Sequence, residues 1–194
     1  VSIAVIKDSY GTVTLKPLLN DPLIYLLQVP VGQDPAILAE QMELDTRLLY
    51  AEPNFVGQIL EGIGRARWAW GGTSDAAMAQ QYAASMLKLP QAQALSNGAN
   101  SVVAVIDTGI QLDHPAYAHS LTASRWDFID NDGMPDENFA AFDTNADGIP
   151  DSLAGHGTHV AEIVHMTAPG AMIMPLRVLD GNGLGDEFKV AEAI

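Results

Sequence analysis

The feature that most constrains the fold is a continuous apolar run at residues 101–106, SVVAVI. A continuous apolar run rich in β-branched residues is typical of a parallel strand that is covered on both faces, whereas a half-exposed strand alternates apolar and polar residues. A turn at Asp107-Thr108-Gly109 follows the run. The run therefore predicts a buried strand in a parallel sheet.

A helix and a second strand come after this turn. Val160, Ile163 and Val164 recur at helical spacing within residues 158–166, and Pro169-Gly170 ends that segment. Residues 171–179 have strand character, and Pro175 within them predicts an edge or bulged strand, because proline lacks the backbone N–H. Strand, helix and strand at this spacing predict a right-handed crossover in a parallel sheet and an α/β fold.

The first part of the chain has a different pattern. Strand-like runs at residues 11–15, 23–29 and 48–50 flank a helix that Asp34 can cap and Pro35 can begin. This arrangement predicts a small α+β unit over residues 1–56. Glycines break residues 57–76, as expected of a linker, and a helix is predicted over residues 76–87.

Charge and composition exclude several classes of protein. The chain has 9 basic and 24 acidic residues, a net charge of −15 that repels phosphate backbones, so we expect no nucleic-acid partner. No run approaches the roughly 18 consecutive apolar residues of a membrane span, so we expect no membrane partner. The absence of cysteine excludes disulfides and thiolate metal sites.

Two motifs carry groups suited to proton transfer. Asp107 directly follows the buried strand, and α/β sheets gather functional groups at that end. His156 lies between two glycines at a predicted helix start, where the helix dipole disfavours the imidazolium form. A carboxylate beside this imidazole would restore its basicity, and Asp107 is the candidate. Each residue alone also fits a structural role, as a turn-capping aspartate or a core histidine.

Together the motifs DTGI, GHGTHVA and APGAMIMPLRVLDGNGLGD resemble the subtilisin-like serine proteases, or subtilases. The resemblance implies that residues 77–194 are the N-terminal half of a doubly wound, parallel-sheet α/β catalytic domain. It also implies peptide-bond hydrolysis by a Ser-His-Asp triad, with Asp107 orienting the imidazole of His156, the general base. Thr108 would steady the aspartate, and His159 would be structural.

The catalytic serine and the oxyanion-hole asparagine of subtilases lie further downstream than residue 194. We therefore expect the sequence to be a fragment at both ends, truncated before the catalytic serine. The alternative is a protein of another class, a non-catalytic pseudoprotease or binding module that keeps the subtilase fold.

The resemblance also assigns a substrate-binding segment. A peptide or protein substrate would pair strand to strand with Gly183, Leu184 and Gly185, beside a pocket walled by Leu179. Glycines suit this role, because they let a peptide backbone come within hydrogen-bonding distance.

An acidic stretch predicts a calcium site. Residues 127–151 hold eight acidic residues and no basic one. Oxygen-bearing side chains stand at positions 1, 3, 5 and 9 of a calcium-binding loop, namely Asp143, Asn145, Asp147 and Asp151, and the carbonyl of Ile149 stands at position 7. Ala154 replaces the usual glutamate at position 12, so water or distant ligands would complete the shell. A merely solvated acidic loop is the alternative.

The N-terminal block resembles the C-terminal part of a subtilase propeptide of ferredoxin-like α+β type. The matching stretches are YGTVTLKPLL, IYLLQVPVGQDPAILAEQME and YAEPN. The resemblance implies that residues 1–56 are a partial propeptide, the protein's own intramolecular inhibitor and folding aid. It further implies a maturation region at residues 57–76 and a secreted, extracellular enzyme.

Two features of the predicted helix at residues 158–166 depart from a simple subtilase. Glu162 stands where the family usually has glycine, so local packing must differ. His156, His159, Glu162 and His165 recur every three residues, which leaves a metal site on this helix as a rival interpretation, although no HExxH motif is present.

Overall fold

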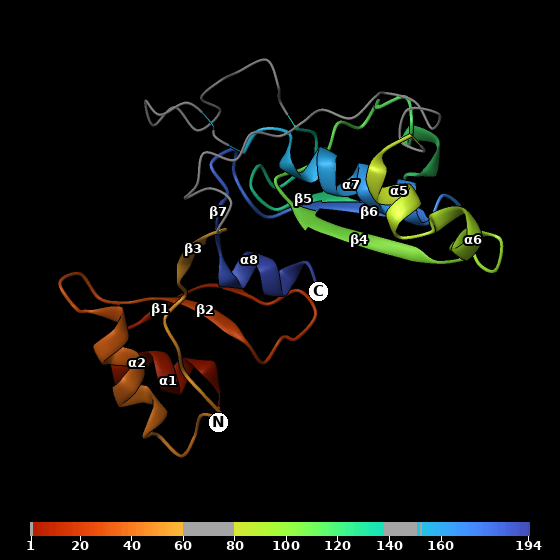
Figure 1. Ribbon diagram of the computed structural model, residues 1–194. Coiled ribbons are helices and arrows are strands. Elements are labelled where there is room, and N and C mark those ends of the chain that lie inside the picture. Colours follow the sequence, from red (N-terminus) through yellow and green to blue (C-terminus); the bar gives the residue numbers. More distant parts are fainter. Residues whose placement is uncertain (1, 60–79, 138–150, 152) are drawn as a thin grey trace. The chain divides into compact units, whose positions relative to one another are not determined.

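The computed structural model describes residues 2–59, 80–137, 151 and 153–194 (Figure 1). The chain divides into two compact units. The first consists of residues 1–56, 186–192 and 194, and the second consists of residues 57–185 and 193. Asp107 and His156 both belong to the second unit.

The first unit combines helices with one antiparallel strand pair. Its elements are α1 (Ile3–Tyr10), β1 (Val13–Pro17), β2 (Tyr25–Gln28), α2 (Pro35–Glu43) and α8 (Glu187–Glu192). Strands β1 and β2 pair antiparallel. Helix α2 begins as predicted, because the Asp34 carboxylate accepts a hydrogen bond of 2.8 Å from the Ala36 amide and Pro35 follows the cap. Helix α1 was not predicted.

The strand predicted at residues 48–50 is wrong, because local hydrogen bonds hold this segment in a turn. The Asp45 carboxylate accepts a hydrogen bond of 3.0 Å from the Arg47 amide, and the Asp45 carbonyl accepts one of 2.9 Å from the Leu48 amide. An aspartate that binds backbone groups two residues on competes with strand pairing.

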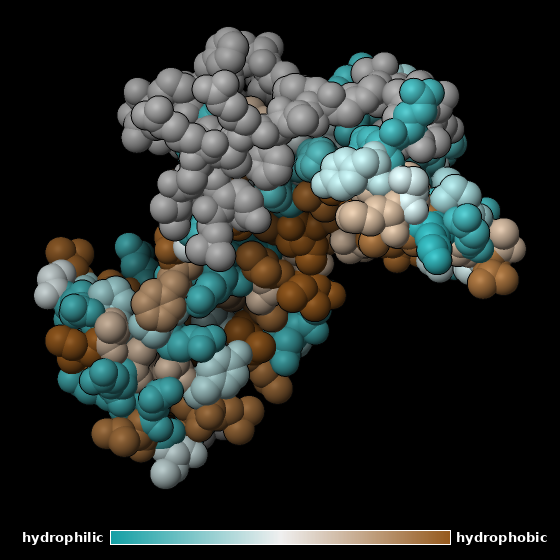
Figure 2. Space-filling model, viewed as in Figure 1, coloured by the Kyte–Doolittle hydropathy of each residue, from teal (hydrophilic) through white to brown (hydrophobic). Residues whose placement is uncertain are grey.

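The core of the first unit is small. Ile6, Leu38 and Met42 form its buried cluster. Hydrophobic and hydrophilic residues are interspersed on the face seen in Figure 2, and large apolar side chains of this unit that remain exposed include Leu15, Leu19, Leu23 and Val31. A small domain has too little interior to bury all of its apolar residues.

The second unit contains a parallel sheet in the order β4-β6-β5. Its strands are β4 (Val102–Asp107), β5 (Trp126–Asp127) and β6 (Met172–Arg177), and α7 (His156–Thr167) crosses one face of the sheet (Figure 1). In the register, Asp107 lies opposite Arg177. Parallel strands with a helix between β4 and β6 confirm the predicted α/β fold.

The prediction that Pro175 marks an edge strand is wrong, since β6 is the central strand. The amides of Met172 and Val178 donate hydrogen bonds toward β4. Because backbone groups alternate in direction along a strand, every second residue between these two also directs its backbone groups toward β4. The alternate residues Ile173 and Arg177 accept from Thr122 and Phe128 on the other side. Pro175 belongs to this second set and falls between those two contacts, so its missing N–H interrupts no pairing.

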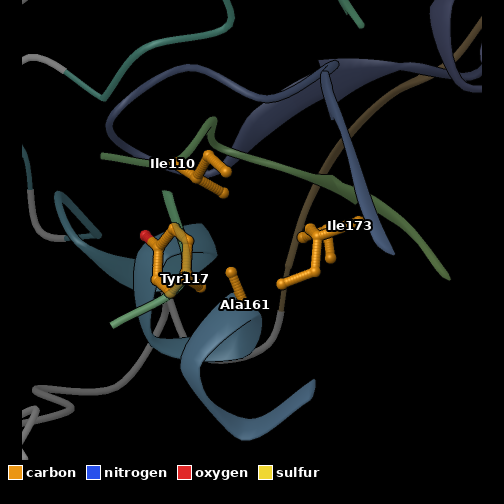
Figure 3. Packing of buried hydrophobic residues seen from close by; sticks show 5 residues of the cluster. Ile110, Tyr117, Ala161 and Ile173 are labelled. Atoms are coloured by element: carbon orange, nitrogen blue, oxygen red, sulfur yellow. The ribbon is translucent and has the colours of Figure 1, made fainter. Parts of the chain in front are cut away.

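The core of the second unit lies between the sheet and α7. Val105, Ile110, Tyr117, Ala161 and Ile173 form one buried cluster (Figure 3). The opposite face of β4 is not covered by the described residues. There Val102 is 57% exposed and Ala104 is also exposed, so among the described residues the predicted burial is found on one face only.

Shorter elements complete the second unit. They are α5 (Tyr82–Met86), α6 (Leu89–Gln93) and the 3₁₀ turn η1 (Ala118–Ser120), with β3 (Val56–Gln58) and β7 (Leu184–Asp186) forming a separate two-stranded sheet. The helix predicted over residues 76–87 begins later, at Tyr82, and residues 76–79 lie outside the described residues. No helix among the described residues is long and apolar enough to cross a membrane.

Candidate active site

Strand β4 ends at Asp107, and helix α7 begins at His156. The Nδ1 atom of His156 lies 2.7 Å from an Asp107 carboxylate oxygen, and the two side chains are 13% and 10% exposed. The structure therefore brings together the two predicted catalytic residues across 49 positions of sequence. Their catalytic roles stay a prediction.

A close approach between two backbones sets the geometry of this pair. A Cβ atom at Gly157 would lie 2.0 Å from the Gly109 carbonyl oxygen and 3.2 Å from the Asp107 Cβ. Only glycine lets α7 start this close to the turn after β4. The glycine after His156 is therefore required by packing at the carboxyl end of the sheet.

The arrangement is suited to general-base chemistry. The Asp107 carboxylate accepts a hydrogen bond of 2.7 Å from the Thr108 amide, which restricts its rotation. With Nδ1–H directed at this carboxylate, Nε2 of His156 carries the lone pair that can take a proton. An ionised aspartate beside the ring then stabilises the imidazolium form.

A buried glutamate beside this pair was not recognised in the sequence. Glu137 is 6% exposed and contacts both the turn after β4 and the start of α7. In the sequence it was only one member of the acidic run at residues 127–151. No local pattern distinguishes it there, because its partners are 18 to 29 residues away in the chain.

The upstream part of the acidic run is held by an arginine from the sheet. Nη1 of Arg177 lies 2.8 Å from Asp127 and 2.7 Å from Asp130. Asp127 also accepts hydrogen bonds from the amides of Ile129 and Asp130. These carboxylates are therefore neutralised by a residue far along the chain.

The predicted calcium loop is mostly outside the described residues. Asp143, Asn145, Asp147 and Ile149 lie there, and only Asp151 is described, packed against the backbone of Gly181. Among the described residues no group of three or more acidic or histidine side chains is arranged to hold a metal ion. The residues of the rival metal site, His156, His159, Glu162 and His165, are all described and do not form such a group.

Glu162 is accommodated by a histidine from another segment. Its Oε1 atom lies 3.0 Å from Nε2 of His114, whose ring stacks on Tyr117 with 4.6 Å between ring centres. Burial lowers the pKa of His114 and raises the pKa of Glu162. Both shifts have the same cause, because burial disfavours the charged form of each side chain.

The four predicted substrate-binding residues lie together around β7. A Cβ atom at Gly185 would lie 2.6 Å from both the Leu179 side chain and the Val178 carbonyl oxygen, and Gly183 has a φ of +74°. The Gly183 carbonyl accepts a hydrogen bond of 3.2 Å from the Ile59 amide. An extended backbone can thus reach this segment, whereas its role with a substrate stays a prediction.

Residues 98–194, half of the chain, match the sequence model of the Peptidase S8 or subtilase family. The chain belongs to the subtilase family. This subtilase is 36% identical over 115 residues to thermitase of Thermoactinomyces vulgaris, a match covering 59% of the chain and 39% of thermitase. It is also 30% identical over 191 residues to an extracellular protease of Xanthomonas campestris pv. campestris, covering 84% of the chain and 32% of that protein.

A solved structure has the same fold. The crystal structure of fervidolysin from Fervidobacterium pennivorans, a keratinolytic enzyme related to subtilisin, superposes with a TM-score of 0.54 at 20% identity. The match covers 98% of the chain and 31% of fervidolysin. The chain spans about a third to two fifths of the length of the two curated relatives, 32% and 39%.

Proposed function

We propose that the intact protein is a serine endopeptidase in which Asp107 and His156 are two members of a Ser-His-Asp triad. The observation that carries the proposal is the contact of 2.7 Å between Nδ1 of His156 and the Asp107 carboxylate at the carboxyl end of β4. Membership of the subtilase family supports the reaction class. The serine and the oxyanion hole come from a segment outside these 194 residues.

The chain's own groups have defined tasks in this reaction. Nε2 of His156 takes the proton of the serine hydroxyl as that oxygen attacks the scissile carbonyl, and then gives the proton to the leaving amine. The Asp107 carboxylate holds the imidazole in the required tautomer and stabilises its positive charge between these two transfers. Thr108 keeps the carboxylate in place through its amide.

Substrate peptides bind as an added strand along Gly183, Leu184 and Gly185, with Leu179 beside them. Residues 58 and 59 show how this segment contacts a backbone, because Gln58 Nε2 donates to the Asn182 carbonyl at 2.9 Å and the Ile59 amide donates to the Gly183 carbonyl. This contact supports a second role for residues 1–56 and the segment after them, as a propeptide that blocks the enzyme until it is cleaved. The extracellular relative supports secretion.

The test of the proposed function is hydrolysis of an unfolded protein substrate by the intact protein. We expect new peptide termini to appear, and we expect a serine-directed phosphonyl fluoride to stop the reaction and add its mass to one serine. A protein that binds unfolded chains without cutting them would contradict the proposal and favour a pseudoprotease.

We further propose a structural calcium ion in the loop between Asp107 and His156. The donor set fits calcium, because Asp143, Asn145, Asp147 and Asp151 offer oxygen atoms and Ile149 offers a carbonyl. Bound calcium would hold together a loop that ends close to His156. A chelator should therefore lower the melting temperature of the intact protein by several degrees, about 5 °C for a loss of 1–2 kcal/mol.

Scanning calorimetry of the intact protein measures this effect. Calcium added back in excess should restore the melting temperature, and magnesium at the same concentration should not, because magnesium requires a tighter octahedral site. Identical melting curves with and without the chelator would reject the calcium site.

A further inference from the structure

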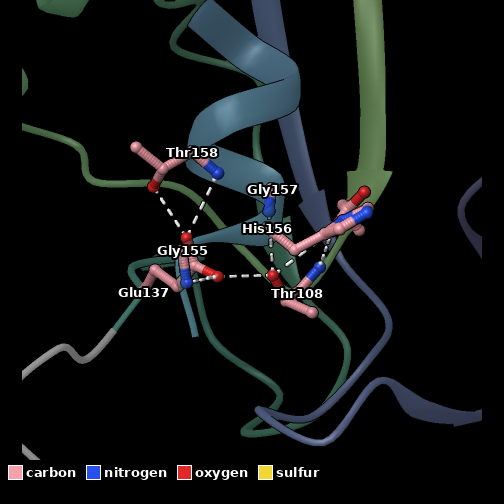
Figure 4. A network of polar contacts seen from close by, with 7 residues as sticks. Thr108, Glu137, Gly155, His156, Gly157 and Thr158 are labelled. Atoms are coloured by element: carbon pink, nitrogen blue, oxygen red, sulfur yellow. Dashed lines mark hydrogen bonds and ion pairs between the residues drawn. The ribbon is translucent and has the colours of Figure 1, made fainter. Parts of the chain in front are cut away.

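A buried glutamate joins the two elements that carry the proposed catalytic pair. Glu137 accepts hydrogen bonds from the Thr108 hydroxyl at 2.5 Å, the Gly155 amide at 2.7 Å, and both the amide and the hydroxyl of Thr158 at 3.1 and 2.7 Å (Figure 4). Thr108 follows β4, and Gly155 and Thr158 lie at the start of α7. One carboxylate therefore ties the turn beyond Asp107 to the helix turn that contains His156.

All four of these contacts come from donors. A protonated carboxyl would have to direct its own hydrogen at one of them, so the geometry fits the ionised carboxylate. The pKa of Glu137 is raised overall by burial, and the hydrogen bonds from Thr108, Thr158 and Gly155 offset only part of this shift. The negative charge also lies at the positive end of the helix dipole of α7, where anions are stabilised.

The Thr108 hydroxyl has a single hydrogen, which it can donate to only one of the two neighbouring carboxylates. This oxygen lies 2.5 Å from Glu137 and 3.2 Å from the Asp107 carboxylate, so the hydrogen is directed at Glu137. The same oxygen accepts a hydrogen bond of 3.0 Å from the Gly157 amide. Asp107 then keeps its remaining close contacts, the Thr108 amide and the His156 ring, both at 2.7 Å.

Helix α7 needs this carboxylate because it has no local cap. Its N-cap residue is Gly155, which has no side chain to accept hydrogen bonds from the first amides of the helix. Glu137 accepts from two of those amides, at Gly155 and Thr158, and the Thr108 hydroxyl accepts from a third, at Gly157. His156 is therefore held on a helix end whose position depends on Glu137.

We propose that Glu137 is a positioning residue of this active site, a distant cap that fixes His156 against Asp107 through Thr108 and the first turn of α7. The inference rests on the proposed function, because it assigns Glu137 to the reaction of Asp107 and His156. The four hydrogen bonds of Glu137 go to Thr108, Gly155 and Thr158, and none of these is a reacting group or a proposed substrate-binding residue. Its effect should thus fall on kcat and leave KM unchanged.

The test is Glu137→Gln in the intact protein. Glutamine has the same shape, but its amide nitrogen would face the backbone N–H of Gly155 on one side or of Thr158 on the other, and neither can accept a hydrogen bond. We expect kcat to fall about 10- to 100-fold with KM within twofold of the wild type, because a displaced catalytic group costs rate more than binding. We also expect the acid limb of kcat/KM to move to lower pH by about half a unit, since a nearby negative charge is lost and Asp107 holds the imidazolium less well.

The matched control is Asp136→Asn, the neighbouring carboxylate. Asp136 is exposed, and its Oδ1 accepts a hydrogen bond of 3.2 Å from the Leu112 amide, which an asparagine oxygen can also accept. This variant should keep the wild-type kcat and pH profile. Should Glu137→Gln fail to accumulate as folded protein, Thr108→Val removes the hydroxyl that links Glu137 to the turn, and it should show a similar fall in kcat with KM within twofold of the wild type.

The outcomes separate this inference from the proposed function. A Glu137→Gln protein with a lower melting temperature but an unchanged kcat and acid limb would make Glu137 merely structural and overturn the inference. A Thr108→Val protein with a wild-type kcat would do the same. An inactive wild type, or an active His156→Ala variant, would instead overturn the proposed function itself.

Discussion

Replacement of His156 by alanine should lower kcat/KM of the intact protein by about 10⁴-fold or more. Without the imidazole no group takes the proton from the serine, and the Asp107 carboxylate loses the partner that lies 2.7 Å away. The same variant should also fail to process its own maturation region. Initial rates on a peptide substrate, with mass determination of the purified protein, measure both effects.

His119→Ala is the control for this experiment. His119 is an exposed histidine on the 3₁₀ turn η1, with its ring against His165 rather than near Asp107. This variant should retain activity within a few-fold of the wild type, since surface substitutions usually change stability by less than about 0.5 kcal/mol. Wild-type rates in the His156→Ala protein would remove the triad assignment.

Gly157→Ala should both destabilise the protein and disable the site. Alanine gains about 1 kcal/mol over glycine from helix propensity alone. Its methyl group, however, would lie 2.0 Å from the Gly109 carbonyl oxygen, a contact with backbone that no side-chain rotation relieves. We therefore expect a net loss of about 3 kcal/mol in the free energy of unfolding. Because the turn or the helix must move, kcat should fall about 10²-fold.

Gly133→Ala is the matched substitution. A Cβ atom at Gly133 would have no atom within 4 Å, so we expect little change in stability and none in kcat. Urea unfolding of the intact protein, followed by intrinsic fluorescence, gives the midpoints of both variants. Equal midpoints for Gly157→Ala and Gly133→Ala would show that α7 does not depend on its close approach to the turn after β4.

The elements with strong local signals could be predicted from the sequence. The apolar run at residues 101–106 predicted β4, and the cap at Asp34 with Pro35 predicted the start of α2. The predicted strand at residues 48–50 failed because the side chain of Asp45 offers the backbone a nearer partner than another strand would. A short apolar run alone does not show whether a segment forms a strand or a turn, since both contain the same residue types.

The candidate site was predictable only where a motif marks it. GHGTHVA and DTGI led to His156 and Asp107, whereas Glu137 carries no motif, and its role depends on donors from two other segments. The density of acidic residues in 127–151 suggests a cation-binding stretch, with the calcium ligands predicted at its downstream end, residues 143–151. At the upstream end, Asp127 and Asp130 are neutralised by Arg177, which follows them in the chain by 50 and 47 residues.

Propensity, capping and hydrophobic period act over a few neighbouring residues, so the sequence is sufficient to predict β4, the start of α2, the α/β class and the two motif residues. Three features emerge only in the folded chain: Pro175 lies in the central strand, Glu162 meets His114, and Glu137 caps the helix of His156. These outcomes depend on which segments meet when the chain folds, and hydrogen bonds between distant segments leave no periodic trace in the sequence.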